Sequence, residues 1–201
     1  LQIKKNIPMG GGLGGGSSNA ATVLLVLNHL WGCGLSNEKL QSLGLRLGAD
    51  VPLFVKGVSA FAQGVGEDLT QTSIPSHYYL VATPNVHVST AEVFGHINLP
   101  RNTPKLDFDN INLSEIFATT QNDCEKLVCD EQVEVANLLH RLLHYAPSRM
   151  TGTGASVFAV FTSFDDASIA YQHLPSNVKG FIAKGLDVSP LHVKLAQRHA
   201  V

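Results

Sequence analysis

The residues best suited to chemistry in this sequence form a glycine-rich loop that leads directly into an apolar segment. Six glycines fall within the seven positions from Gly10 to Gly16. Glycine lets backbone N–H groups crowd around an anion, because no Cβ blocks the approach. The next residues predict a helix, whose unpaired N-terminal donors and partial positive charge favour the same anion. We therefore expect a phosphate site formed by Pro8, Met9, Gly10, Gly11, Gly12, Leu13, Gly14, Gly15, Gly16, Ser17, Ser18 and Asn19.

Three other interpretations of this loop fit the sequence less well. A Walker A loop requires a lysine directly after its last glycine, where this sequence has Ser17. A dinucleotide-binding fingerprint matches the spacing of Gly10, Gly12 and Gly15, but it requires a second strand ending in an acidic residue about 20 residues later. The sequence predicts a second helix instead, with Ser36 as its N-cap. A flexible linker is disfavoured because an apolar helix begins at once.

The glycine-rich loop resembles the second motif of the GHMP small-molecule kinases, a family that includes galactokinase, homoserine kinase and mevalonate kinase. Residues 47–52, Leu-Gly-Ala-Asp-Val-Pro, are similar to the segment that carries the catalytic aspartate in one branch of that family. Residues 148–156, Ser-Arg-Met-Thr-Gly-Thr-Gly-Ala-Ser, are similar to its third motif, a second glycine loop. The three motifs stand in the family's order, and the resemblance extends over essentially the whole chain.

The resemblance implies an α+β chain with the two-domain GHMP kinase fold. Residues 1–75 would form an incomplete, ribosomal-protein-S5-like N-terminal domain that binds ATP, and residues 76–201 a ferredoxin-like α/β sandwich. The family has a further N-terminal region, with a lysine that pairs with the catalytic aspartate and aromatic residues for a cytosine ring. No segment of this chain matches that region. We therefore expect the chain to be a C-terminal portion of a longer protein that need not be active alone.

The longer glycine run before Ser17 and Ser18 resembles one branch of the family. Members of that branch phosphorylate the 2-hydroxyl of a cytidine diphosphate-linked methylerythritol, in the non-mevalonate pathway to isoprenoid precursors. The resemblance implies ATP as the phosphoryl donor, Mg²⁺ as the cofactor and this small molecule as the acceptor. Two alternatives remain open: another GHMP kinase, acting on homoserine or mevalonate, and a non-catalytic fragment that binds a phosphate or a nucleotide.

Asp50 is the leading catalytic candidate. A carboxylate beside an acceptor hydroxyl can take or orient its proton, and the family resemblance puts Asp50 in that role. The alternative is a turn aspartate that hydrogen-bonds its own backbone. Gly48 and Ala49 before it and Val51 and Pro52 after it predict a constrained turn between a helix and a strand.

The two serines and one lysine near the loop are the next candidates. One hydroxyl of Ser17 or Ser18 would reach Mg²⁺ or the β-phosphate while the other caps the helix, although capping by both stays open. Asn19 either touches phosphate or is a first-turn helix residue. Lys5 lies on a predicted strand over residues 1–7, where it faces the nucleotide or is an exposed edge-strand lysine beside Lys4.

Five residues are expected on the substrate side by resemblance. Phe94 would flank the cytosine, with core packing as its alternative, and Thr90 would bond near the reacting hydroxyl. Gly152 and Gly154 would form a loop that packs against the first glycine loop, although any α/β protein needs such a turn after a helix. Thr153 would offer a donor to the substrate.

Composition narrows the class of protein. The formal net charge is -2 in 201 residues, so charge gives no reason to expect a nucleic acid or a membrane surface as partner. The three cysteines show no metal-ligand spacing, which suits a reducing cytoplasm. His140 and His144 stand one helical turn apart, and we expect them on a solvated helix face. The predicted protein is cytoplasmic, without nucleic-acid or membrane partners, and a monomer or a homodimer.

Periodicity and turn residues predict the remaining elements. Ser89 is expected to cap a helix that runs to Phe94, and residues 98–112 to form a long loop. The other predicted elements are strands at 58–64, 66–69, 78–82, 157–161 and 180–184, and helices at 131–145 and 165–174.

Overall fold

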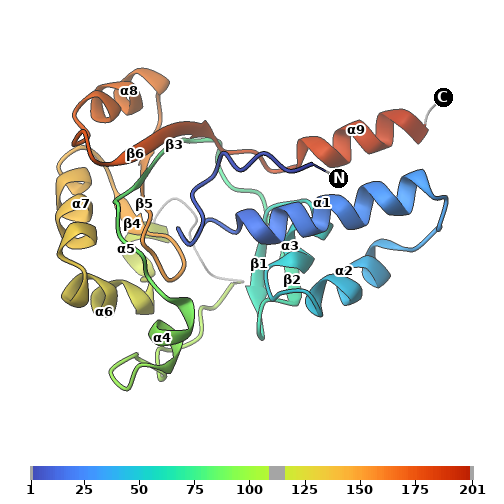
Figure 1. Ribbon diagram of the computed structural model, residues 1–201, viewed down its shortest axis with the longest axis horizontal. Coiled ribbons are helices and arrows are strands. Elements are labelled where there is room, and N and C mark those ends of the chain that lie inside the picture. Colours follow the sequence, from blue (N-terminus) through green and yellow to red (C-terminus); the bar gives the residue numbers. More distant parts are fainter. Residues whose placement is uncertain (1, 109–115, 200–201) are drawn as a thin grey trace. The chain divides into compact units, whose positions relative to one another are not determined.

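The computed structural model describes residues 2–108 and 116–199 and divides into two compact units. The sheet unit contains the residues up to Leu13 together with Pro75–Gly185, and the helical unit contains Gly14–Ile74 together with the residues from Leu186 onward. Figure 1 shows the elements of each unit along the chain. The expected domain limits, 1–75 and 76–201, stay a prediction, since these two units are each made of two separate stretches of the chain.

The sheet unit is built on four antiparallel strands in the order β4-β5-β3-β6. The central strand β3 (Tyr78–Thr83) pairs with β5 (Val157–Phe161) on one side and with β6 (Lys179–Lys184) on the other. The short edge strand β4 (Ser148–Met150) pairs with β5. The second glycine loop is therefore the connection between two neighbouring strands, which fixes both of its ends.

Helices cover this sheet and complete its core. The amphipathic helix α7 (Val133–Leu143) packs on β4 and β5, and α8 (Phe164–Gln172) packs on β3 and β6 (Figure 1). Burial of the apolar face of α7 removes apolar surface from water, the main source of stability in such a unit. The remaining helices of the unit are α4 (Thr90–Gly95), α5 (Ile116–Thr119) and α6 (Asp123–Glu131).

The helical unit has its own small core. Helices α1 (Gly15–Leu30), α2 (Asn37–Leu45) and α3 (Val51–Lys56) bury Ala21, Leu25, Leu40, Val51 and Val55 against one another. The hairpin of β1 (Ala60–Gln63) and β2 (Asp68–Gln71) follows α3, and α9 (Pro190–His199) ends the unit. None of the helices among the described residues is long and apolar enough to cross a membrane.

Hydrogen bonds to Asp187 explain why the C-terminal segment belongs to the helical unit. Its carboxylate accepts from Ser73 Oγ at 2.5 Å and from the Ile74 backbone N at 3.0 Å. The Ser73 hydroxyl first, then the Ile74 N–H and the Ser59 hydroxyl, hold the pKa of Asp187 below its ordinary value. The adjacent residue Val188 forms a β-bridge with Val58.

Several predicted elements are confirmed. Ser36 and Ser89 cap their helices through their side chains, and the strand at 157–161 has the expected bounds. The loop expected at 98–112 has no helix or strand over residues 98–108, and its remainder lies outside the described residues.

The strand predicted over residues 1–7 is wrong over the residues that the structure describes. Residues 2–7 form no strand, because a strand needs a hydrogen-bonded neighbour and none of the described strand pairings includes them. The helix expected at 131–145 is confirmed as α7, which begins at Val133 because Gln132 has the extended backbone angles φ -125° and ψ 92°.

Candidate active site

Helix α1 begins on a glycine turn, earlier than the serines suggested. Its N-cap is Gly14, which has the left-handed angles φ 61° and ψ 14° and provides no side-chain cap. Ser17 and Ser18 are the third and fourth helical residues, so the prediction that one of them caps the helix is wrong. The first N–H groups of α1 are left for another acceptor and the serine hydroxyls are not used for capping, which suits an anion site. Asn19 is the fifth residue of α1, two positions after Ser17.

Within the sheet unit, the first glycine loop is locked against the second. Thr151 Oγ1 donates to the Gly12 carbonyl at 2.7 Å, and the Ser156 backbone N donates to the Gly11 carbonyl at 3.3 Å. Gly12 has φ +69°, and a Cβ built there would lie 2.3 Å from the Thr151 carbonyl oxygen. Only glycine allows this approach of two backbones. Residues 10–13 therefore owe their shape to the loop at 151–156.

The second glycine loop brings together the substrate-side residues expected from the sequence. Gly152 and Gly154 have φ +54° and +88°, and the Gly154 backbone N donates to the Thr151 carbonyl at 2.9 Å. Thr153 is 7% exposed, and its hydroxyl shares a 2.9 Å hydrogen bond with that of Thr90, the first residue of α4. The structure thus joins Thr90, Gly152, Thr153 and Gly154 in one cluster.

Phe94 lies on the same short helix as Thr90. Its side chain is 55% exposed, so the alternative in which Phe94 packs into the core is excluded. The neighbouring residue Val93 fills that role, with 3% exposure. An exposed aromatic ring one turn beyond a threonine hydroxyl is well placed to stack on a planar group.

Ser156 is a residue to which the sequence analysis gave no role. It is fully buried, and its hydroxyl shares a 2.8 Å hydrogen bond with that of Thr83 at the end of β3. A Cβ on Gly11 would lie 2.6 Å from the Ser156 Oγ. Ser156 therefore packs directly against Gly11 of the first glycine loop. Its position at the end of the third motif gave no indication of this contact.

Asp50 precedes α3, with the turn expected on its N-terminal side and a helix, rather than the predicted strand, on the other. Pro52 at the start of α3 explains the difference, since proline is well tolerated in the first turn of a helix. Asp50 is exposed and makes no side-chain cap to α3, so its carboxylate is not used by its own backbone.

The Asp50 segment lies beside the start of α1 within the helical unit. A Cβ on Gly48 would be 3.9 Å from the Ser17 Oγ, and a Cβ on Gly14 would be 3.0 Å from the Phe54 ring of α3. On its other side, the β1–β2 turn approaches closely, because a Cβ on Gly66 would lie 3.0 Å from the Ala49 carbonyl oxygen. Shared packing of α1 and α3 therefore places the segment that contains Asp50 beside the first turn of α1.

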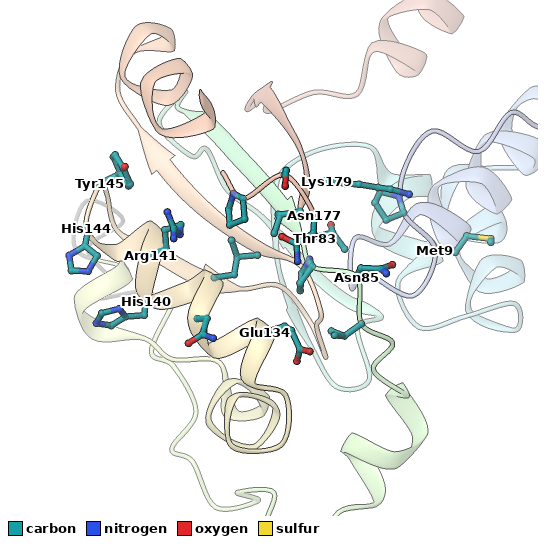
Figure 2. A pocket seen from close by; sticks show the side chains of 18 residues that line it. Met9, Thr83, Asn85, Glu134, His140, Arg141, His144, Tyr145, Asn177 and Lys179 are labelled. Carbon is teal, nitrogen blue, oxygen red and sulfur yellow. The ribbon is translucent and has the colours of Figure 1, made fainter. Parts of the chain in front are cut away.

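A cleft of about 1440 Å³ opens on the sheet unit (Figure 2). Its walls come from α7, the end of β3 and the loop before β6, with Thr83, Glu134 and Lys179 among its lining residues. Of the predicted site residues, only Pro8 and Met9 line it. The cleft is therefore not the cluster formed by the glycine loops.

The remaining predicted residues lie on the surface. Lys5 is exposed on the non-strand segment 2–7, and Met9 is 80% exposed. His140 on α7 and its C-cap His144 are both exposed, with their ring centroids 4.8 Å apart in an edge-on arrangement. Over residues 2–108 and 116–199, no group of three histidine, cysteine, aspartate or glutamate side chains can hold a metal ion.

Comparison with known proteins shows the family and the fold of this chain. The family model described as "GHMP kinases N terminal domain" matches residues 1–58, and that described as "GHMP kinases C terminal" matches residues 111–180. A crystal structure of 4-(cytidine 5'-diphospho)-2C-methyl-D-erythritol kinase superposes with a TM-score of 0.75 at 31% identity, covering 90% of this chain and 68% of that one. A homoserine kinase from Cytophaga hutchinsonii shares the fold, with a TM-score of 0.63 at 17% identity over 92% of this chain and 69% of its own.

The fold and the paired glycine loops thus define the class, a two-domain α+β kinase of the GHMP type. Proteins named 4-diphosphocytidyl-2-C-methyl-D-erythritol kinase are 58% identical in Pseudoalteromonas atlantica and 55% identical in Shewanella woodyi, each over 98% of this chain. The chain belongs to the 4-diphosphocytidyl-2-C-methyl-D-erythritol kinase family. It spans 67% and 68% of the length of these two relatives.

Replacing Gly12 tests the contact between the two loops. We expect Gly12→Ala to destabilise the sheet unit by on the order of 2 kcal/mol, because Ala is strained at positive φ and its Cβ meets the Thr151 carbonyl. Gly95→Ala is the matched control, since no atom lies within 4 Å of its Cβ and its backbone is helical. Urea denaturation of both variants measures the difference, and equal midpoints would contradict the locked-loop arrangement.

Proposed function

We propose that this chain carries the phosphoryl-transfer site of an ATP-dependent kinase whose acceptor is the 2-hydroxyl of 4-diphosphocytidyl-2-C-methyl-D-erythritol. The observation that carries the proposal is the uncapped start of α1 on a glycine loop that a second glycine loop holds in place. The names of the relatives at 58% and 55% identity support the choice of acceptor.

The phosphates of ATP are bound chiefly by backbone groups in this proposal. Gly15, Gly16 and Ser17 present the first N–H groups of α1, and the helix dipole adds partial positive charge at the same end. Gly10, Gly12 and Gly14 all have φ between +61° and +69°, which turns the loop backbone and leaves no side chains in the way. Lys5 remains a proposed contact to the nucleotide.

The residues present fit a Mg²⁺ ion that is held mainly by phosphates. Mg²⁺ in kinase sites typically keeps waters and uses few protein ligands besides substrate phosphates, so a dedicated cluster of carboxylates is not required. The Ser17 and Ser18 hydroxyls, which do not cap α1, are the proposed protein contacts. When bound, the ion neutralises charge on the phosphoryl oxygens.

Asp50 addresses the acceptor. Its carboxylate accepts a hydrogen bond from the 2-hydroxyl and so aims the oxygen at the γ-phosphorus, and the proton leaves toward the carboxylate as the new P–O bond forms and the bond to ADP breaks. The packing of this segment beside α1 supports the role, since a Cβ on Gly48 would lie 3.9 Å from the Ser17 Oγ in the first turn of that helix.

The cluster on the sheet unit provides the substrate side. The paired hydroxyls of Thr90 and Thr153 offer donors and acceptors near the reacting carbon chain, since each hydroxyl can donate once and accept twice. Gly152 and Gly154 let the acceptor approach the loop backbone. The exposed ring of Phe94 stacks on the cytosine. A cytoplasmic location and a monomeric or homodimeric state remain predictions from the sequence.

Measurement of ADP release with a panel of acceptors tests the proposed function. The assay compares the chain itself with the chain joined behind the N-terminal region of the Pseudoalteromonas atlantica relative, using 4-diphosphocytidyl-methylerythritol, homoserine and mevalonate. We expect release with the cytidyl acceptor alone. Release with another acceptor would overturn the substrate, and nucleotide binding without release in either protein would favour a binding fragment.

Substitution of Asp50 separates chemistry from nucleotide binding. In the joined protein, Asp50→Asn should lower kcat by about 10²- to 10⁴-fold, because the amide cannot accept the proton. The affinity for ATP should stay within about twofold, since backbone groups hold the phosphates. Asp68→Asn, at an exposed carboxylate on β2 of the same unit, is the control. Retention of normal turnover by Asp50→Asn would eliminate this role.

Substitution of Phe94 tests recognition of the base. Phe94→Ala should raise KM for the cytidyl acceptor by about 5- to 150-fold and leave KM for ATP unchanged, because stacking on a base contributes about 1–3 kcal/mol. Ile97→Ala is the control, since Ile97 is 91% exposed and lies three residues further on. An unchanged KM for the acceptor would show that the Phe94 ring does not contact the base.

A further inference from the structure

One side chain outside the predicted site, that of Asn122, binds the second glycine loop. Asn122 is the N-cap of α6, and its Oδ1 accepts from the Cys124 backbone N at 3.0 Å. Its Nδ2 donates to the Met150 carbonyl at 2.9 Å and to the Gly152 carbonyl at 2.8 Å. The amide orientation follows from these partners, since its oxygen faces an N–H group and its nitrogen faces two carbonyls. One side chain thus caps a helix and grips a loop.

The first turn of α6 adds a further hydrogen bond to the start of this loop. Glu125 Oε2 accepts from the Met150 backbone N at 2.7 Å, so both backbone groups of Met150 are bonded to α6 and its cap. Arg149 is tied to the preceding segment, because its guanidinium donates to the Phe117 carbonyl at 3.0 Å and to the Thr120 hydroxyl at 2.7 Å. Besides its pairing with β5, the start of the loop is therefore held by α5, α6 and the residues between these two helices.

What the loop presents on its other side is the proposed site. Thr151, between the two carbonyls that Asn122 binds, donates its hydroxyl to Gly12 of the first glycine loop. Thr153, the residue after Gly152, shares its hydrogen bond with Thr90. A shift of the Met150–Gly152 backbone moves both contacts together.

We propose that Asn122 is a positioning residue for phosphoryl transfer, which acts through the second glycine loop and touches neither nucleotide nor acceptor. This inference rests on the proposed function and adds to it. Asn, Asp and Ser are comparable helix caps, but only Asn combines the capping acceptor with a two-hydrogen donor. An ionised aspartate at position 122 would place an acceptor against the carbonyls of Met150 and Gly152, and a serine is too short to reach both.

Three variants of the joined protein test this role. Asn122→Asp keeps the cap and removes the donor, and Asn122→Ser does so without adding charge. Ser163→Ala is the matched control, because Ser163 caps α8 through Oγ, 3.1 Å from the Asp166 backbone N, at the opposite end of β5 from the loop. For each protein we would measure thermal stability, kcat, both KM values and hydrogen exchange of the Gly154 and Ser156 amides.

We expect both Asn122 variants to lower kcat by about 100-fold, because a displacement of about 1 Å in a site lowers the rate by that factor. Each KM should stay within about threefold. Exchange at the Gly154 and Ser156 amides should accelerate. Ser163→Ala should lose a comparable amount of thermal stability and keep its kcat and its loop protection. A kcat that falls only in proportion to the folded fraction, or unchanged protection of the loop amides, would overturn the positioning role.

The proposed function and this inference fail separately. If the unsubstituted protein phosphorylates no acceptor, the proposed function falls, and the exchange data still decide whether Asn122 holds the loop. If the unsubstituted protein is active and the loop loses protection in Asn122→Ser without a change in kcat, the proposed function stands and the positioning role is overturned.

Discussion

The contact on which the site depends is the approach of two backbones at Gly12 and Thr151. The positive φ of Gly12 and the 2.3 Å that would separate its Cβ from the Thr151 carbonyl allow no side chain at this position. The approach lets Thr151 bond to Gly12 and Ser156 bond to Gly11, so each loop supplies hydrogen-bond partners that the other lacks. Ordering a loop of six glycines loses much conformational entropy, and these contacts offset that loss.

The strand order around the second loop makes this contact possible. The loop joins the neighbouring antiparallel strands β4 and β5. Both ends of the loop therefore lie at the same end of the sheet. Buried Ser156 directly precedes β5, and its hydroxyl forms a hydrogen bond with that of Thr83 at the end of β3. The central strands thus carry the rigidity of the sheet core to the loop, whose own residues include several without large side chains.

Local signals allowed much of the fold to be predicted. The caps at Ser36 and Ser89 depend on residues three positions apart, and β5 is an apolar run between turns, so neighbouring residues determine them. The start of α1 was misplaced because Ser17 and Ser18 have good capping side chains, whereas the left-handed backbone of Gly14 ends the loop three residues earlier. The strand at residues 1–7 failed because pairing depends on distant partners, which periodicity does not encode.

The same distinction applies to the candidate site. The glycines, Asp50, Thr90 and Thr153 were found because family motifs contain them. Asn122 and Ser156 were given no role, because their importance comes from hydrogen bonds to residues 28 and 73 positions away in the chain. An asparagine before an acidic helical turn indicates only a cap. Its second contribution appears once Met150 and Gly152 are placed against it.

A phosphate site without a lysine in its loop places unusual demands on shape. In a Walker A loop, a flexible cation reaches the outer phosphates and tolerates small errors in the backbone. Here the proposed donors are backbone N–H groups and a helix terminus, whose directions are fixed by φ and ψ alone. The strength of these hydrogen bonds falls steeply when the backbone shifts, because a hydrogen bond weakens once its donor–hydrogen–acceptor angle is below about 120°. Residues that hold the loops, such as Thr151 and Asn122, therefore matter to such a site as much as residues that touch the phosphates.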